Sequence, residues 1–194
     1  QASFQQSTMF SNWTYYLLFQ FVFLALVAVC KQPVAQKFTV QHDVLGMGRS
    51  YTITDDLGGS HYTIKNEWLS VGKKLSLWEN GKEVFEIKHE LGHLFTQWRI
   101  YDASGKEIGL LKHKAHLGGD RYKVKSDFGK YKIEGNFIDR TFTVGKNGHT
   151  VAEIHKDLDL VHDKYTIKVY PGENPGFILL MCIAIDNIRH HNKT

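Results

Sequence analysis

The stretch FILLMCIAI, at residues 177–185, decides the fold because every position in it is apolar. It is too short to span a bilayer, which takes about 20 apolar residues. It contains no turn residue, and its Leu, Met and Ala residues favour a helix. A helix that is apolar on every face must be buried on every face. We therefore expect a buried helix over residues 176–189, and we assign to its core Phe177, Leu180, Cys182, Ile183 and Ile185.

The sequence before this helix has the pattern of strands. Apolar and polar residues alternate in short runs such as YTIT (51–54), LSLW (75–78), RYKVK (121–125) and TFTV (141–144). This alternation is the period of a strand with one buried face, and the enrichment in Thr, Tyr, Val and Ile agrees with it. The apolar helix therefore belongs to a protein that is otherwise made of β-strands.

Turn residues recur at a nearly constant spacing along these strands. Gly81, Gly105 and Gly129 follow one another at intervals of 24 residues, and NGKEVFEIKH from Asn80 resembles SGKEIGLLKH from Ser104. Asn-Gly and Ser-Gly supply the positive φ angles of tight hairpins. A unit of this length holds two strands and two turns, so about six hairpins give about twelve antiparallel strands.

These observations combine into one architecture. We predict an all-β closed barrel of about twelve antiparallel strands over residues 37–170, with the helix at 176–189 filling its interior. A barrel of twelve strands is wide enough to hold more than its own side chains. Four large residues are expected to face the helix or to cap the barrel: Trp68, Trp78, Trp98 and Phe137.

The composition of the 194-residue chain excludes several classes of protein. Hydrophobic residues make up 42% and only 3 residues are proline, which excludes intrinsic disorder and collagen-like structure. The two cysteines, Cys30 and Cys182, are too few for a disulfide-rich scaffold or a four-thiolate zinc site. The net charge of +4 permits attraction to anionic lipid or nucleic acid without requiring either. We expect the thiol of Cys182 to be free and buried.

Residues 1–30 form an apolar N-terminal segment, which we separate from the barrel domain at residues 31–194. The segment contains no Lys, Arg, Asp or Glu. It fits a secretory signal peptide, with Met9 as a candidate start, and it also fits a single membrane anchor. We predict secretion through the signal peptide and keep the single-pass anchor as the alternative. In the anchored form, Lys31 and Lys37 would place the barrel domain on the cytoplasmic side.

Four segments carry a resemblance to a known family. They are YTITDD at 51–56, WLSVGKKLSLWENGKEVFEI at 68–87, KYKIEGNF at 130–137 and FILLMCIAIDNI at 177–188. On these segments, residues 48–190 resemble the LURP-one-related domain, within the tubby-like and phospholipid scramblase-like superfamily. The resemblance implies a tubby-like barrel of twelve strands around a hydrophobic C-terminal helix. It also implies a role without established catalysis: tubby domains bind phosphoinositides, scramblases act at membranes, and plant members are associated with defence against pathogens.

A basic region at residues 112–132 is the main candidate for a binding site. Strand alternation places three cations on one face of a strand and two on one face of the next strand. These residues are Arg121, Lys123, Lys125, Lys130 and Lys132. If the two faces coincide, the cations form a patch that suits an anionic phospholipid or a membrane surface. Lys73 and Lys74 lie in one of the family-like segments and are further candidates for this patch.

The sequence HELGH at residues 89–93 matches the HExxH motif of zinc peptidases. That motif binds zinc from a helix, in which histidines at i and i+4 share a face. Here the five residues fall between two expected strands, so we predict a loop. Zinc binding by His89, Glu90 and His93 is kept as an alternative only, and we predict no catalytic residue, no metal site and no cofactor.

These inferences lead to one predicted function and two alternatives. We predict a non-catalytic, monomeric barrel protein that acts at or near a membrane by binding phospholipid or protein, and we expect no nucleic-acid partner. The first alternative is an interaction module, structural or associated with defence, that has no lipid role. The second alternative is a zinc-dependent hydrolase that uses HELGH.

Overall fold

The computed structural model describes residues 15–21, 34–43, 49–67, 73–90, 97–114, 121–136, 141–157 and 164–191. The chain divides into two compact units, Gln1–Val34 and Ala35–Thr194, and each is considered by itself. In the first unit, residues 15–21 are helical and their side chains are exposed. Within the described ranges, no helix has both the length and the hydropathy needed to cross a bilayer. Most of the expected signal peptide or anchor lies outside these ranges.

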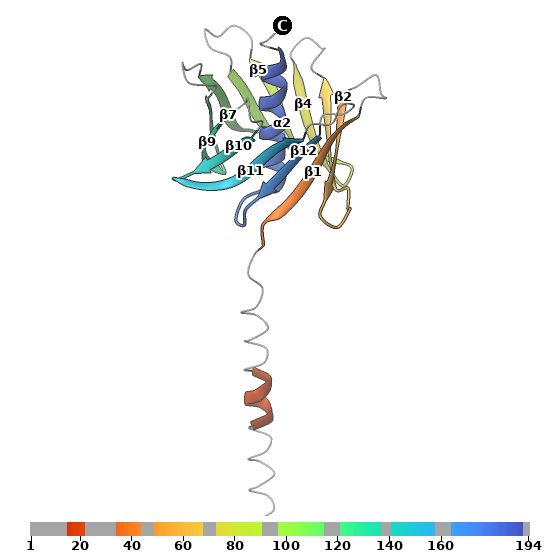
Figure 1. Ribbon diagram of the computed structural model, residues 1–194, viewed down its shortest axis with the longest axis vertical. Coiled ribbons are helices and arrows are strands. Elements are labelled where there is room, and N and C mark those ends of the chain that lie inside the picture. Colours follow the sequence, from red (N-terminus) through yellow and green to blue (C-terminus); the bar gives the residue numbers. More distant parts are fainter. Residues whose placement is uncertain are drawn as a thin grey trace, which may run out of the picture. The chain divides into compact units, whose positions relative to one another are not determined.

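The second unit is a closed barrel of twelve antiparallel strands, which confirms the predicted fold (Figure 1). The strands are β1 Gln36–Asp43, β2 Arg49–Asp55, β3 Tyr62–Glu67, β4 Lys74–Glu79, β5 Lys82–Glu90, β6 Gln97–Asp102, β7 Glu107–Lys114, β8 Arg121–Ser126, β9 Gly129–Asn136, β10 Thr141–Lys146, β11 His149–Asp157 and β12 Lys164–Val169. Each strand pairs with its neighbours in sequence, and β12 closes the ring by pairing with β1. Because the ring closes, every strand has a partner on both sides.

The turns between strands use the residues that the repeat contains. Asn80 and Gly81 join β4 to β5 with φ angles of 48° and 79°, and Asn147 and Gly148 join β10 to β11 with φ angles of 53° and 83°. Such left-handed pairs match the twist of the strands that they connect, and Asn and Gly tolerate them best. The repeated Asn-Gly and Ser-Gly sequences therefore mark the hairpins, as expected.

The interior of the barrel is filled by α2, Pro175–His191, which agrees with the predicted helix to within two residues at each end. Figure 1 shows α2 inside the ring of strands. Every residue from 176 to 188 is buried, so the helix is enclosed around its whole circumference. The exposed fractions of Phe177, Leu180, Cys182, Ile183 and Ile185 lie between 0% and 9%. Isoleucines, valines and tyrosines from the inward face of the strands complete this core.

Polar contacts hold both ends of α2. At the start, the Asn174 side chain accepts a hydrogen bond of 3.0 Å from the backbone N–H of Phe177, which is an N-cap. Just before it, the Glu173 carboxylate accepts bonds of 2.7 Å from the Tyr131 hydroxyl and 2.9 Å from Lys146 Nζ. These contacts join the beginning of the helix to β9 and β10.

Towards the other end, two consecutive polar residues of α2 are buried. The Tyr165 hydroxyl donates to the Asp186 carboxylate at 2.5 Å. The Asn187 side chain accepts from Asn66 Nδ2 at 2.9 Å and donates to the Tyr51 hydroxyl at 3.0 Å. A buried polar group is stable only when it is hydrogen-bonded, so these contacts fix the depth and rotation of the helix in the barrel.

The expectation for the large aromatic residues is right for Trp98 and wrong for Trp78. Trp98 is 2% exposed and belongs to the core. Trp78 lies on the outer face, where Lys65 Nζ is 3.6 Å from its ring centroid. Strand alternation explains the difference, because the neighbouring Leu77 takes the inward position. The other two of these residues lie outside the described part of the chain: Trp68 and Phe137.

Candidate anion-binding surface

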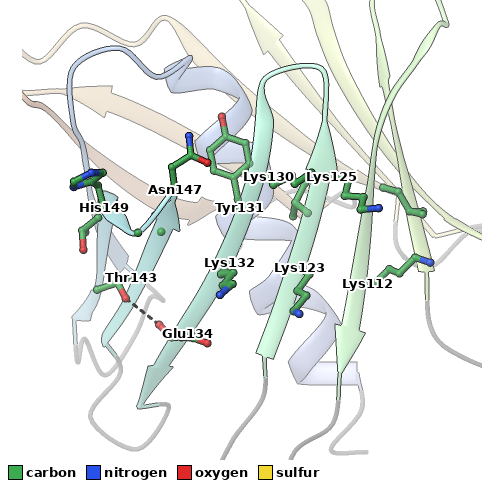
Figure 2. Close-up of a pocket in the computed structure, with 15 residues that line it drawn as sticks. Lys112, Lys123, Lys125, Lys130, Tyr131, Lys132, Glu134, Thr143, Asn147 and His149 are labelled. Atoms are coloured by element: carbon green, nitrogen blue, oxygen red, sulfur yellow. Dashed lines mark hydrogen bonds between the residues drawn. The ribbon is translucent and has the colours of Figure 1, made fainter.

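Five exposed lysines lie together on the outer face of β7, β8 and β9 (Figure 2). We call them the lysine surface: Lys112, Lys123, Lys125, Lys130 and Lys132. Their neighbours in sequence, such as Tyr122, Val124 and Tyr131, are buried in the core. Alternation along each strand therefore sends every second residue outward, and in β8 and β9 most of these residues are lysines.

The register of the strands places these lysines directly opposite one another. Lys123 pairs with Lys132, and Lys125 pairs with Lys130, across β8 and β9. On the other side, Lys112 of β7 pairs with Lys123. The two predicted faces therefore coincide. Side chains that are directly opposite have Cβ atoms about 5 Å apart, and like charges in such pairs destabilise a sheet.

The lysine surface has no neutralising partner among the described residues, because no carboxylate there forms an ion pair with any of its members. Other lysines of the barrel differ. Lys106 Nζ lies 2.8 Å from Asp127, Lys146 Nζ lies 2.9 Å from Glu173, and Lys156 Nζ lies 3.8 Å from Asp186. The positive charge is thus concentrated on one face and left available to an anion.

A groove of about 870 Å³ runs along this face. The five lysines of the surface form one side, and the β10–β11 hairpin with Asn147 and His149 forms the other (Figure 2). Gly145 lies on the lining between them, and a Cβ atom added there would meet nothing closer than 3.8 Å. The missing side chain at Gly145 leaves the groove open between its two sides.

A β-bulge shapes the wall formed by the β10–β11 hairpin. Val144 pairs with Ala152, but the next residue, Gly145, pairs with Thr150, so Val151 is an extra residue in β11. A bulge of this kind bends the strand and increases its local twist. The hairpin that borders the lysine surface is therefore bent beside Gly145.

Arg121 lies on the same outer face as the lysines but belongs to an ion pair. Its Nε atom is 3.7 Å from a carboxylate oxygen of Glu134, which also lines the groove. Glu134 lies next to Thr143 of β10, whose hydroxyl donates to the Glu134 backbone carbonyl at 3.3 Å. Arg121 is therefore neutralised and does not belong to the lysine surface. Lys112 replaces it as the fifth cation of the set that we expected from the sequence.

Lys73 and Lys74 do not join the lysine surface, contrary to the expectation from the sequence. Lys74 lies on β4, which is separated from β8 by three strands of the ring. It is also neutralised, because its Nζ atom lies 3.0 Å from the buried carboxylate of Glu86, which Lys88 contacts as well. Burial alone would raise the pKa of Glu86, but hydrogen bonds from Lys88 and Lys74 outweigh it and hold that pKa below its usual value.

The first two residues of the HExxH sequence lie in a strand and not in the loop that we predicted for the motif. His89 and Glu90 are the last residues of β5, paired with β6, because this strand is nine residues long. They are therefore not on a helix, which is what brings the two histidines of the motif together. His93 lies outside the described residues. Within those residues, no three His, Cys, Asp or Glu side chains are placed to hold a metal ion.

The ring of His89 packs against an aromatic ring of the core. Its ring centroid lies 4.5 Å from that of Trp98, which is directly opposite on β6. Burial, with a smaller contribution from the charge of Lys73, lowers the pKa of His89 below its usual value. This shift favours the neutral form of the imidazole.

The sequence alone does not identify the second side of the groove. Alternation predicts the lysines of β8 and β9, but Asn147, His149 and Thr150 join them only through the register of β9, β10 and β11. A usable signal was present in Gly145, a glycine in the interior of an otherwise regular strand. Such a glycine often marks a bulge or a place where a ligand approaches the backbone.

Comparisons with known proteins agree with this architecture. The family model for LURP-one-related proteins matches residues 36–186, which contain all twelve strands and the part of α2 up to Asp186. The X-ray structure of a protein from Arabidopsis thaliana matches with a TM-score of 0.59 and 16% identity, over 79% of this chain and 91% of that chain. At that identity the likeness concerns the fold. No curated protein matches the chain. The chain therefore belongs to the LURP-one-related family, as its sequence motifs suggested.

Proposed function

We propose that this protein is a non-catalytic barrel that acts at a membrane by binding anionic phospholipid through the lysine surface. The supporting observation is the pairing of lysine with lysine across β7, β8 and β9, with no carboxylate partner among the described residues. These pairs destabilise the free protein by mutual repulsion. An anionic surface relieves that repulsion, so the arrangement favours the bound state.

The expected strength of this contact is moderate. A basic residue near an anionic membrane contributes about 1 kcal/mol, so five lysines contribute about 5 kcal/mol at low salt. That amount gives reversible binding, which salt weakens over a Debye length of about 8 Å at physiological ionic strength. Stable attachment requires a second signal.

The apolar N-terminal segment at residues 1–30 is the candidate for this second signal. As a membrane anchor, it would place the barrel on the cytoplasmic side, where the leaflet carries anionic lipid. As a cleaved signal peptide, it would export the barrel, and the lysine surface would then meet anionic groups outside the cell. Sequencing the N-terminus of the native protein distinguishes the two forms.

Vesicle sedimentation tests the proposal with the full chain. Binding is measured to phosphatidylcholine vesicles with and without phosphatidylserine, and the ratio of the two partition coefficients removes any contribution of the apolar segment. One variant replaces four lysines of the surface by glutamine: Lys123, Lys125, Lys130 and Lys132. A control variant of equal net charge replaces four exposed lysines elsewhere on the barrel: Lys37, Lys65, Lys82 and Lys168.

We expect the surface variant to lose the preference for anionic vesicles by at least about 100-fold, since four cations contribute about 4 kcal/mol. The control variant should retain most of the preference. Equal losses in both variants would mean that net charge alone attracts the protein. A wild-type protein without any preference would rule out lipid binding at this surface and leave the interaction module without a lipid role.

A further inference from the structure

We propose that the groove beside the lysine surface is a discrete site for a phosphomonoester group, so that the protein distinguishes phosphatidate from other anionic lipids. This inference rests on the proposed function and names the chemical class of its ligand. It follows from three features of the groove: paired charges, an open floor at Gly145 and a polar opposite side.

The charge of the ligand follows from the pairing of the lysines. Lys123 and Lys132 form one direct cross-strand pair, and Lys125 and Lys130 form another. Each pair carries two positive charges on Cβ atoms about 5 Å apart. A phosphodiester carries one negative charge and leaves one ammonium group of a pair uncompensated. A phosphomonoester carries about −1.5 to −2 at pH 7 and offers three acceptor oxygens, so a single group satisfies both members of a pair.

The shape of the groove supports a discrete site. The groove has a volume of about 870 Å³ and is lined by residues of five strands. Gly145 has no side chain to fill the space beside Lys132, its partner across β9 and β10. A Cβ atom at Gly145 would have room, and the φ angle there does not require glycine. A larger side chain at this position can therefore fill the space without straining the backbone.

The opposite side of the groove provides neutral polar groups. Asn147 and Thr150 line it from the turn and from β11, and Figure 2 shows Asn147 on this side. Hydroxyl and amide groups donate hydrogen bonds to phosphate oxygens and complement the ammonium groups of the lysines. A phosphate held between the two sides would meet donors from both.

The groove is less suited to single-stranded nucleic acid, which binds basic grooves through bases stacked on aromatic rings. Tyr131 lines the groove, but it is 2% exposed and its hydroxyl donates to Glu173. Its ring centroid also lies 5.8 Å from that of Phe177 in α2. This tyrosine is therefore part of the core and is not a platform for a base.

The test compares the full chain with two variants that fill the groove without changing its charge, Gly145→Leu and Thr150→Leu. Thr39→Leu, on the outer face of β1, is the matched control. Binding is measured to phosphatidylcholine vesicles that contain phosphatidate or phosphatidylserine at fractions giving equal surface potential. Thermal unfolding of each variant verifies that it is folded. If Gly145→Leu does not fold, Thr150→Leu provides the test.

We expect the wild type to bind the phosphatidate vesicles at least 10-fold more tightly than the phosphatidylserine vesicles. The groove variants should lose this preference while their binding to phosphatidylserine changes less than two-fold, and Thr39→Leu should behave as the wild type. If millimolar glycerol 3-phosphate releases the wild-type protein from the phosphatidate vesicles, the phosphate group alone is sufficient for binding at the site. A preference without displacement would assign it to phosphate at a bilayer, and both results support the site.

Two results would overturn the inference. One is equal binding of the wild type to both vesicles, and the other is a groove variant that is folded and keeps the full preference. In either case, loss of all anionic binding in the four-lysine variant would leave the proposed function intact. If the four-lysine variant binds as the wild type does, both the function and the site are wrong. The inference would also be contradicted if a single-stranded oligonucleotide released the protein from the vesicles and glycerol 3-phosphate did not.

Discussion

The buried carboxylate of Glu86 shows how a single residue is stabilised by its neighbours. It is 8% exposed, and it contacts Lys74 at 3.0 Å and Lys88 on its own strand. Removing one charge from such a buried group leaves the remaining charges without an ion-pair partner, which destabilises the fold. These contacts explain why the pKa of Glu86 lies below its usual value in spite of burial.

The lowered pKa of Glu86 leads to a prediction about acid stability. The unfolded chain takes up this proton first as the pH falls below about 4.5, so the folded state loses stability until the folded carboxylate is protonated as well. We expect Glu86→Gln to cost about 2 kcal/mol at pH 7 and less at pH 3. Urea unfolding at both pH values measures this difference. An equal cost at both pH values would mean that the charge of Glu86 does not contribute.

Cys182 tests whether α2 is enclosed by the barrel. The thiol is free and buried, and burial raises its pKa to about 12. We expect Cys182→Asp to destabilise the fold by about 4 kcal/mol, because it places a charge among apolar groups, and Cys182→Ala by about 1 kcal/mol. A water-soluble maleimide should label the thiol only in denaturant. Rapid labelling of the folded protein would show that the helix is accessible, and the enclosed-helix structure would then be wrong.

Residue-level features were predictable from the sequence where they depend on alternation alone. The outward positions of Lys123 and Lys132 follow from the period of a strand. Neutralisation of Lys74 was not predictable, because it depends on which residue of β5 lies beside it, and Glu86 is 12 residues further along the chain. Alternation fixes the face of a side chain, whereas its partners are fixed by the register.

At the scale of the strand, the sequence repeat encodes a repeated irregularity. Three hairpins skip one residue in the pairing of their strands. In each, the extra residue is the fifth one counted from the first residue of the turn, which is Asn80, Ser104 or Asn147. The extra residues are Val84, Ile108 and Val151. All three are apolar and pack in or against the core. A bulge can place two consecutive residues on one side, so the repeat adds an apolar residue in or beside the core at each hairpin.

The bulge in β7 predicts which substitution in this strand destabilises the fold, and simple alternation would predict a different residue. Ile108 is 7% exposed, although alternation from the buried Leu111 would point it outward. We expect Ile108→Ala to destabilise the fold by about 3 kcal/mol and Leu110→Ala, on the outer face of the same strand, by less than about 1 kcal/mol. Denaturant midpoints measure both. A larger cost at Leu110 would show that β7 has no bulge.

At the scale of the whole molecule, the barrel and the helix form one core. The inner face of the strands packs around α2, and the polar contacts of Glu173, Asp186 and Asn187 join the helix to strands around the ring. Neither part buries its apolar surface without the other. Unfolding should therefore be a single cooperative event for the whole domain.

Removing the helix tests this dependence directly. A chain that ends at Gly172 retains all twelve strands but lacks α2. We expect this fragment to show no cooperative unfolding transition and to bind a hydrophobic dye, because the lining of the barrel is then exposed to water. The full chain provides the control in the same assay. A fragment as stable as the full chain would mean that the strands hold together without the helix.

The sequence is sufficient for the architecture because local and global signals agree. Hairpins join neighbouring strands, so the order of β1 to β12 follows from the spacing of the turns. Closure follows from FILLMCIAI, because a helix that is apolar on every face needs a wall on every side. The groove is different. It combines residues of five strands, including Lys112 and Thr150, and these residues come together only through the register of β7 to β11.

The position of α2 after the last strand has a consequence for biosynthesis. Most of the strands leave the ribosome before the residues that close and fill the barrel have emerged, and the closing pair joins Gln36 to Val169. Contacts between residues so distant in sequence form slowly, and apolar strand faces are exposed in the meantime. The nascent chain is therefore prone to aggregate until α2 has emerged. We expect the yield of folded protein in the cell to depend on chaperones that bind unfolded chains.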